Sequence, residues 1–110
     1  MDAFAALAEP TRRSILEMLA VNGNLSATDI YKNFAASPPA ISQHLKVLKN
    51  ANLVRVEKRA QKRIYYVNPE PMKELEEWIQ IFTKEWQDRH DRLEALLRRQ
   101  ISHVPKEGLS

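Results

Sequence analysis

The sequence predicts a mainly α-helical fold with one small β-hairpin, and three observations support this prediction. Apolar residues recur at helical spacing through most of the first 50 residues. Between residues 53 and 67 they recur with a period of two, and many are β-branched or aromatic. From residue 70 the helical pattern returns and continues to residue 101. We therefore expect the order α-α-α-α-β-β-α in a single domain, residues 1–101.

The first two helices have clear start signals. Asp2 is a good N-cap for a short helix that reaches Ala8. Pro10 suits the first turn of a second helix, residues 10–22, because proline lacks the amide hydrogen that this position does not need. The pair Asn22-Gly23 is typical of a helix end. We interpret Arg12 and Arg13, in the first turn of this helix, as structural ion-pair partners.

The third and fourth helices are separated by a tight connection at residues 35–37. Ser26 is the expected N-cap of a short third helix. Ser37 followed by Pro38 supplies a start signal for a fourth helix, residues 38–51. Its apolar residues lie at i, i+4 and i+7, so the opposite face is predicted to be exposed. The inward residues are Ile41, Leu45 and Leu48, and the outward residues are Pro39, Ala40, Ser42, Gln43 and Lys46.

The hairpin is predicted over residues 53–67, with a polar turn at residues 59–62. Asn68-Pro69 then ends the second strand, and a long amphipathic helix follows, residues 70–101. The tail, residues 102–110, is expected to be frayed.

The length of the last helix predicts a dimer. At 1.5 Å per residue the helix would be about 45 Å long, which is more than a compact domain of this size can cover. A second copy of the same helix is the simplest cover for its apolar stripe, because most soluble oligomers are twofold homodimers. Its aromatic residues are favoured as core and interface over a ligand cage. The expected interface residues are Phe4, Leu7, Leu75, Trp78, Ile79, Phe82, Trp86, Leu93, Leu96 and Leu97.

Composition excludes several classes of protein. Without cysteine the chain has no disulfide, thiolate metal site or cysteine nucleophile, and two glycines cannot form a glycine-rich phosphate loop. No serine and histidine are spaced for catalysis, so we expect no enzyme activity and no cofactor. The chain also lacks the run of about 20 apolar residues that a membrane helix needs, and the cytoplasm is the expected location.

The positive charge is concentrated in one segment. The net charge is +3, and residues 38–69 contain seven basic residues and one acidic residue. Residues 1–37 and 70–101 each carry a slight negative excess. A basic segment made of an exposed helix face and a hairpin favours nucleic acid as the partner.

The order of a short helix, a tight turn, a helix with a small polar face and a basic hairpin is typical of a winged helix-turn-helix. In that fold the second helix of the pair enters the major groove of DNA, and the hairpin, or wing, approaches the backbone. Small residues allow close approach, Ser42 and Gln43 can hydrogen-bond to base edges, and basic residues bind phosphates. The candidate DNA-binding residues are Thr28, Ser37, Pro38, Pro39, Ala40, Ser42, Gln43, His44, Lys46, Arg59, Lys62 and Arg63.

Other interpretations of these residues remain open. Ser42 and Gln43 are also common on solvated helix surfaces. The hairpin cations Arg59, Lys62 and Arg63 could serve only to protect an edge strand from aggregation. His44 suits either a phosphate contact or packing beside the hairpin.

Three parts of the sequence resemble the ArsR/SmtB-type repressors. Residues 37–48 followed by 50–54 resemble the recognition helix of that family and the residues after it. Residues 9–16 and 63–66 resemble its first long helix and second wing strand. The resemblance covers approximately residues 3–101. It implies a homodimeric repressor that binds a palindromic operator.

The resemblance also implies DNA contacts at Pro38, Pro39, Ser42 and Gln43. Many members carry glutamine where Pro38 stands, so Gln43 is the stronger candidate for a base contact. The wing also lacks the glycine that the family often has at its tip.

The metal sites of the family are incomplete. The thiolate site would fall near residues 25–30, where there is no cysteine. Asp88 and His90 match the first half of the other site, but Ile101 stands where its later histidine belongs, and His103 is out of register. We expect no metal, and the chain resembles cysteine-free members with no obvious effector.

Two further functions remain possible at this point. A winged-helix module could use its basic hairpin and tryptophan-rich helix to bind a protein partner without binding specific DNA. Alternatively, a DNA-binding repressor could be gated by an unknown effector ligand.

Overall fold

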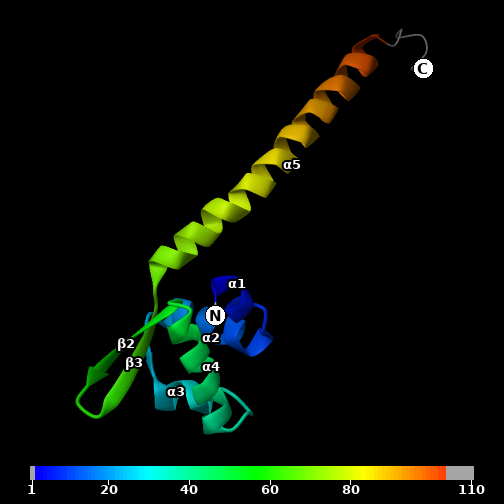
Figure 1. Ribbon diagram of the computed structural model, residues 1–110. Coiled ribbons are helices and arrows are strands. Elements are labelled where there is room, and N and C mark those ends of the chain that lie inside the picture. Colours follow the sequence, from blue (N-terminus) through cyan, green and yellow to red (C-terminus); the bar gives the residue numbers. More distant parts are fainter. Residues whose placement is uncertain (1, 104–110) are drawn as a thin grey trace. The chain divides into compact units, whose positions relative to one another are not determined.

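The computed structural model describes residues 2–103 and confirms the mainly helical prediction (Figure 1). The elements, in order, are α1 (Ala3–Leu7), α2 (Pro10–Asn22), β1 (Leu25–Ser26), α3 (Ala27–Lys32), α4 (Pro38–Asn50), β2 (Val54–Arg59), β3 (Lys62–Val67) and α5 (Pro69–His103). Figure 1 shows α2, α3 and α4 gathered beside the hairpin of β2 and β3.

The predicted order of elements lacked β1. This strand pairs with β3, so the antiparallel sheet has the order β1-β3-β2. Two residues are too short to show a period, and Ser26 alone indicated only a helix start. Ser26 both belongs to the strand and caps α3, because it pairs with Ile64 and its hydroxyl accepts a hydrogen bond from the amide of Asp29 at 3.1 Å. The sheet is thereby connected to the start of α3.

Side chains cap the helix starts, as the sequence predicts. The carboxylate of Asp2 accepts from the amide of Ala5 at 2.7 Å, and the hydroxyl of Ser37 accepts from Ala40 at 3.4 Å. At α2 the cap is Glu9, whose carboxylate accepts from the amide of Arg12 at 3.0 Å. These bonds occupy amides that have no partner within the helix.

The prediction that Arg12 and Arg13 form ion pairs is wrong. Both guanidinium groups instead donate to carbonyl oxygens at the end of α1: Arg12 to Ala5 and Ala6, and Arg13 to Leu7. The carbonyl of Ala5 also accepts from the amide of Ala8 at 3.2 Å, and the partial negative charge at this helix end attracts cations.

Helix α4 ends in a turn that buries two leucines. The amide of Leu53 donates to the carbonyl of Leu48, and the amide of Asn52 donates to the carbonyl of Lys49, both at 2.9 Å. Asn52 has φ of +62°, the left-handed conformation that this Schellman turn requires. Leu48 and Leu53 are fully buried, so the turn adds to the core.

Asn68 connects three elements. It is the only buried polar residue in the described part of the chain, at 1% exposure. Its side-chain amide donates to the carbonyl of Asn52 at 2.9 Å, and its backbone amide donates to Leu53 at 3.0 Å. Its side-chain oxygen accepts from the amide of Glu70 at 3.4 Å. The end of β3, the turn after α4 and the start of α5 are therefore held together.

The core lies among the helices of the first part of the chain. The predicted inward residues of α4 are confirmed, since Ile41, Leu45 and Leu48 are at most 1% exposed. The other fully buried apolar residues are Ala6, Ile15, Leu19, Ile30 and Leu53. With α4 buried on this face, its opposite face is left to solvent.

The chain divides into two compact units, with the boundary between Lys73 and Glu74. The side chains of residues 76–100 are nearly all exposed, so they add little to the core. Helix α5 continues to His103, two residues past its predicted end, and residues 104–110 of the predicted tail lie outside the described residues. Among the described residues, no helix combines the length and the apolar composition needed to cross a lipid bilayer.

Candidate nucleic-acid interface

The outward face of α4 is small, polar and fully accessible. Ser37, the two prolines that follow it, Ala40, Ser42, Gln43 and Lys46 are all exposed. At about 100° per residue, Pro39, Gln43 and Lys46 fall on one line opposite the buried residues. Gln43 therefore points most directly away from the core, with only small or polar side chains around it.

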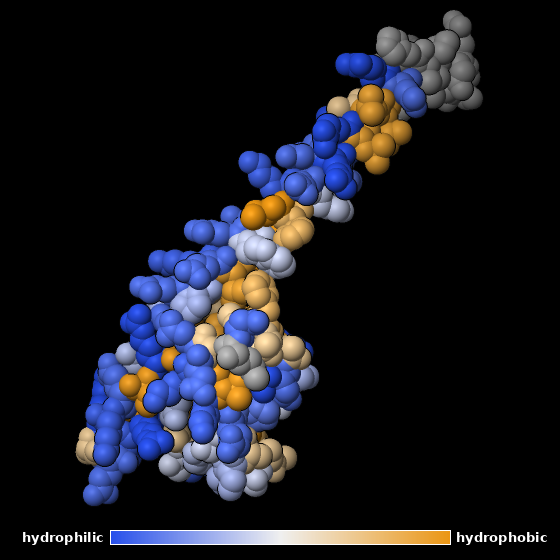
Figure 2. All heavy atoms as spheres, viewed as in Figure 1, coloured by the Kyte–Doolittle hydropathy of each residue, from blue (hydrophilic) through white to orange (hydrophobic). Residues whose placement is uncertain are grey.

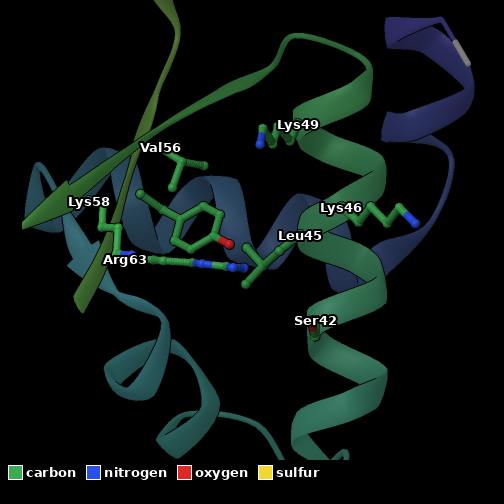
Figure 3. A pocket seen from close by; sticks show the side chains of 8 residues that line it. Ser42, Leu45, Lys46, Lys49, Val56, Lys58 and Arg63 are labelled. Carbon is green, nitrogen blue, oxygen red and sulfur yellow. The ribbon is translucent and has the colours of Figure 1, made fainter. Parts of the chain in front are cut away.

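A cleft separates α4 from the hairpin (Figure 3). Its volume is about 400 Å³. In Figure 3, Lys49 extends from α4 toward the hairpin, Arg63 extends from β3 toward α4, and Lys46 points away from the cleft. The lining residues are Ser42, Leu45, Lys46, Lys49, Val56, Lys58, Arg63 and Tyr65. Its four charged residues are all basic.

Lys49 and Lys58 were absent from the sequence-based candidates. Lys49 lies seven residues after Ser42 and three after Lys46, which is the spacing of one helix face. That spacing could have identified Lys49. Lys58 could be placed only through the register of the hairpin, which sets it directly opposite Arg63.

The charges of the hairpin are arranged unfavourably for the isolated chain. Lys58 pairs with Arg63 across the strands, and Arg59 pairs with Lys62. Like charges directly opposite each other destabilise a hairpin. Among the ion pairs of the described residues, none includes Lys58, Lys62 or Arg63. The end of the wing therefore presents cations that an external anion would neutralise.

Arg59 differs from the other wing cations. Its guanidinium lies 3.0 Å from the carboxylate of Glu57, which also accepts a hydrogen bond from the hydroxyl of Tyr66 at 3.2 Å. The charge of Arg59 is thus already partly neutralised within β2, unlike the charges of Lys62 and Arg63.

Thr28 lies beside the tip of the wing. It lines a second hollow of about 280 Å³ with Tyr31, Gln61, Lys62 and Arg63. Arg63 lines both hollows and therefore lies near both Thr28 and α4. The tertiary structure therefore brings Thr28 and these wing residues together.

His44 occupies the flank of α4 that faces α2. Its Nδ1 lies 3.3 Å from Nη1 of Arg12 and 3.8 Å from Oε2 of Glu9, and its side chain is 25% exposed. These contacts are with the start of α2. They differ from one of the two expectations for His44, which was packing beside the hairpin.

The pKa of Glu9 reflects these contacts. Burial acts to raise it, but a backbone hydrogen bond from Arg12 and the nearby His44 act in the opposite direction, as do hydrogen bonds from Thr11. The net effect lowers the pKa of Glu9 below its usual value of 4.5.

The residues predicted to form the dimer interface are mostly exposed. Figure 2 shows hydrophobic side chains along one edge of α5 and hydrophilic side chains along the other. Leu75 differs, because it is only 8% exposed within one chain and offers little area to a partner. Leu7 is partly buried. The exposed residues are Phe4, Trp78, Ile79, Phe82, Trp86, Leu93, Leu96 and Leu97.

Histidine and acidic side chains do not gather into a metal site. Among the described residues, no group of three such side chains lies close enough together to hold an ion. His90 instead stacks on the ring of Trp86, with centroids 5.2 Å apart, and its Nε2 lies 3.2 Å from Glu94.

Comparison with known proteins assigns the chain to a family. Residues 9–56 match the family described as bacterial regulatory protein, arsR family. The transcriptional repressor SdpR of Bacillus subtilis (strain 168) is 35% identical over 78 residues, which cover 71% of this chain and 86% of SdpR.

Two solved structures are also similar. The crystal structure of a possible transcriptional regulator for arsenical resistance is 37% identical with a TM-score of 0.67, covering 86% of this chain and 95% of that one. An ArsR-like transcriptional regulator from Rhodococcus sp. RHA1 is 26% identical with a TM-score of 0.66, covering 84% and 87%. The chain therefore belongs to the ArsR family of bacterial regulatory proteins, whose members regulate transcription and are not enzymes.

Proposed function

We propose that the protein is a homodimeric transcriptional repressor that acts in the cytoplasm and reads a palindromic operator with α4 in the major groove. The main supporting observation is the exposed line of Pro39, Gln43 and Lys46, together with the wing residues Lys62 and Arg63, which have no acidic partner among the described residues.

Gln43 is the residue that we assign to base recognition. A glutamine amide can bond bidentately to N6 and N7 of adenine in the major groove. The neighbouring residues Pro39, Ala40 and Ser42 are small enough to let the helix approach the base edges. Ser42 adds a hydroxyl that can donate or accept.

The basic residues provide affinity without reading sequence. Lys46 on α4 and Lys62 and Arg63 on the wing would contact phosphates, and Thr28 would add a neutral hydrogen bond. Neutralising phosphates releases counterions, so binding should weaken steeply as salt rises.

A dimer would place two recognition helices on successive turns of one face of DNA. That arrangement requires half-sites about 34–36 Å apart, which is one helical repeat. The apolar stripe of α5 supports pairing through a second copy, since the stripe is exposed in the single chain.

Selection of bound sequences from random duplex DNA tests the proposal. We expect a palindromic motif with half-sites one helical turn apart. Recovery of no motif would contradict specific recognition. Binding to a protein partner without any preference among duplexes would contradict the proposed function and favour an interaction module.

Two substitutions separate base recognition from phosphate contact. Gln43→Ala should reduce the ratio of operator to random-DNA affinity by about tenfold, at an unchanged salt slope, because one bidentate contact is lost. Lys46→Ala should weaken binding to all duplexes alike and reduce the salt slope by about one. Titrations at several salt concentrations measure both. An unchanged sequence preference in Gln43→Ala would contradict the assignment of Gln43.

A further inference from the structure

The guanidinium of Arg12 makes three contacts that together reach two helices. Its Nε donates to the carbonyl of Ala6 at 2.6 Å, and Nη2 donates to the carbonyl of Ala5 at 3.2 Å. Its Nη1 lies 3.3 Å from Nδ1 of His44, on α4. Because a guanidinium can only donate, Nδ1 is the accepting nitrogen in this contact. We call this set of contacts the Arg12 bridge.

The Arg12 bridge fixes geometry better than a single hydrogen bond does. The guanidinium is planar, so its three donors point in fixed directions. The contacts to Ala6 and His44 are partly buried, which limits competition from water. A small movement of α1 relative to α4 would break at least one of them.

Glu9 supports the same junction from the first turn of α2. Its carboxylate accepts the backbone amide of Arg12 at 3.0 Å and lies 3.8 Å from Nδ1 of His44. Glu9 therefore fixes the backbone at Arg12, whose guanidinium contacts the middle turn of α4. His44 directly follows Gln43, so a rotation of α4 that displaced His44 would also displace Gln43.

Arg13 provides a natural comparison. It caps the same helix, since its Nη1 donates to the carbonyl of Leu7 at 2.7 Å. No hydrogen bond found among the described residues joins Arg13 to α4. The two arginines are thus alike in capping α1 but differ in their connection to the recognition helix.

We propose that Arg12 is a positioning residue, which holds α4 through His44 in the orientation that presents Gln43 to the major groove. The bridge also connects α1, whose Phe4 is exposed and predicted to contact a partner subunit, to α4. Dimer contacts at α1 would thus influence DNA binding without touching DNA. This inference rests on the proposed function. It assigns His44 a positioning role in place of the phosphate contact that the sequence left open.

The test compares Arg12→Ala, Arg13→Ala, His44→Ala and the double variant Arg12→Ala/His44→Ala in the full-length chain. We expect Arg12→Ala and His44→Ala each to weaken operator binding by about tenfold, the scale expected for one hydrogen bond to a charged group. The double variant should match the single variants, because both break the same contact. Arg13→Ala should stay within about twofold of wild type, although it loses a comparable cap.

Further measurements separate positioning from a loss of folding and from direct contact. Denaturant unfolding gives the folded fraction of each variant. If Arg12→Ala fails to fold, His44→Ala still tests the contact, because it leaves the caps of α1 intact. The salt slope of His44→Ala should equal that of wild type, whereas loss of a phosphate ligand lowers it. Equal affinities for Arg12→Ala and Arg13→Ala, or additive effects with a lower slope for His44→Ala, would overturn the proposal.

Amide hydrogen exchange tests the bridge without DNA. Exchange in α4 should rise in Arg12→Ala and His44→Ala and remain unchanged in Arg13→Ala, since opening of this helix reports its local stability. Unchanged exchange in all three variants would refute the bridge. If exchange changes as expected but wild type prefers no duplex, the proposed function fails and the structural link stands.

Discussion

Within the described residues, two residues other than glycine adopt the left-handed conformation, and they suit it to different degrees. Asn52, after α4, has φ of +62°, and Ala60, in the turn of the hairpin, has φ of +55°. Asparagine tolerates this region because its side chain can bond locally, whereas alanine places its Cβ against the backbone. The loop between β2 and β3 has two residues, with positive φ at only the first, which matches a type II′ turn. Glycine is the preferred residue at that position.

Ala60→Gly should therefore stabilise the protein. Relief of the left-handed alanine is worth about 1–2 kcal/mol, and the greater entropy of glycine in the unfolded chain offsets about 0.5–1 kcal/mol of it. We expect a net gain of about 0.5–1 kcal/mol in the free energy of unfolding, measured by urea denaturation.

Gln61→Gly is the matched control for this substitution. It adds a glycine to the same loop at a position without positive φ, so only the entropic cost applies. We expect Gln61→Gly to lower the free energy of unfolding. If both glycine variants shift stability by the same amount, strain at Ala60 is refuted.

At the scale of elements, α2 depends on an acidic cap. The amide of Arg12, in its first turn, donates a hydrogen bond to the carboxylate of Glu9. The partial positive charge at a helix N-terminus also favours a negative group there. The lowered pKa of Glu9 means that the folded state prefers the ionised carboxylate. Protonation of Glu9 therefore opposes folding.

Glu9→Gln should reveal this effect as a dependence on pH. A carboxyl whose pKa is lower in the folded state stabilises above its unfolded pKa, and that contribution is lost as the pH falls through the folded value. We expect wild type to be more stable than Glu9→Gln at neutral pH. The difference should shrink as the pH falls below the usual value of 4.5. Denaturant unfolding of both proteins between neutral pH and about pH 3 measures it, and a difference independent of pH would contradict the role of the charge.

At the scale of the whole molecule, the apolar stripe of α5 is exposed in the described residues. At about 100° per residue its seven exposed apolar side chains fall within an arc of about 100°, the width of a buried helix face. Trp78 and Phe82 already contact each other edge to face, with centroids 4.7 Å apart. Ile81 is exposed as well but lies outside this arc.

Phe82→Glu should therefore dissociate the proposed dimer, and Ile81→Glu should not. The two positions are adjacent and almost equally exposed, at 55% and 56%, but they lie on different faces of α5. We expect Phe82→Glu to raise the dimer dissociation constant about a hundredfold, as expected for an aromatic residue at the centre of an interface. Analytical ultracentrifugation measures this constant. A monomeric wild type, or equal effects of both substitutions, would count against pairing through this stripe.

The sequence by itself determined every element except β1, and it determined the exposed face of α4. The caps Asp2, Ser26 and Ser37 each bond an amide three residues away, so the signal and its effect lie within one helical turn. The inward face of α4 followed from the spacing of its leucines and isoleucine. Such local preferences depend on residues that are close together in the sequence, so they can be predicted without knowledge of the fold.

Only the tertiary structure decided how these elements combine at the proposed DNA-binding surface. Strand β1, the cleft with Lys49 and Lys58, and the contact between Arg12 and His44 all join segments distant in sequence; the last pair is 32 positions apart. The periodicity of the sequence does not predict such contacts, because they depend on the packing of the core that brings α2, α4 and the hairpin together. The sequence could thus place Gln43 on an exposed face, whereas the fold alone shows which side chains hold that face in position.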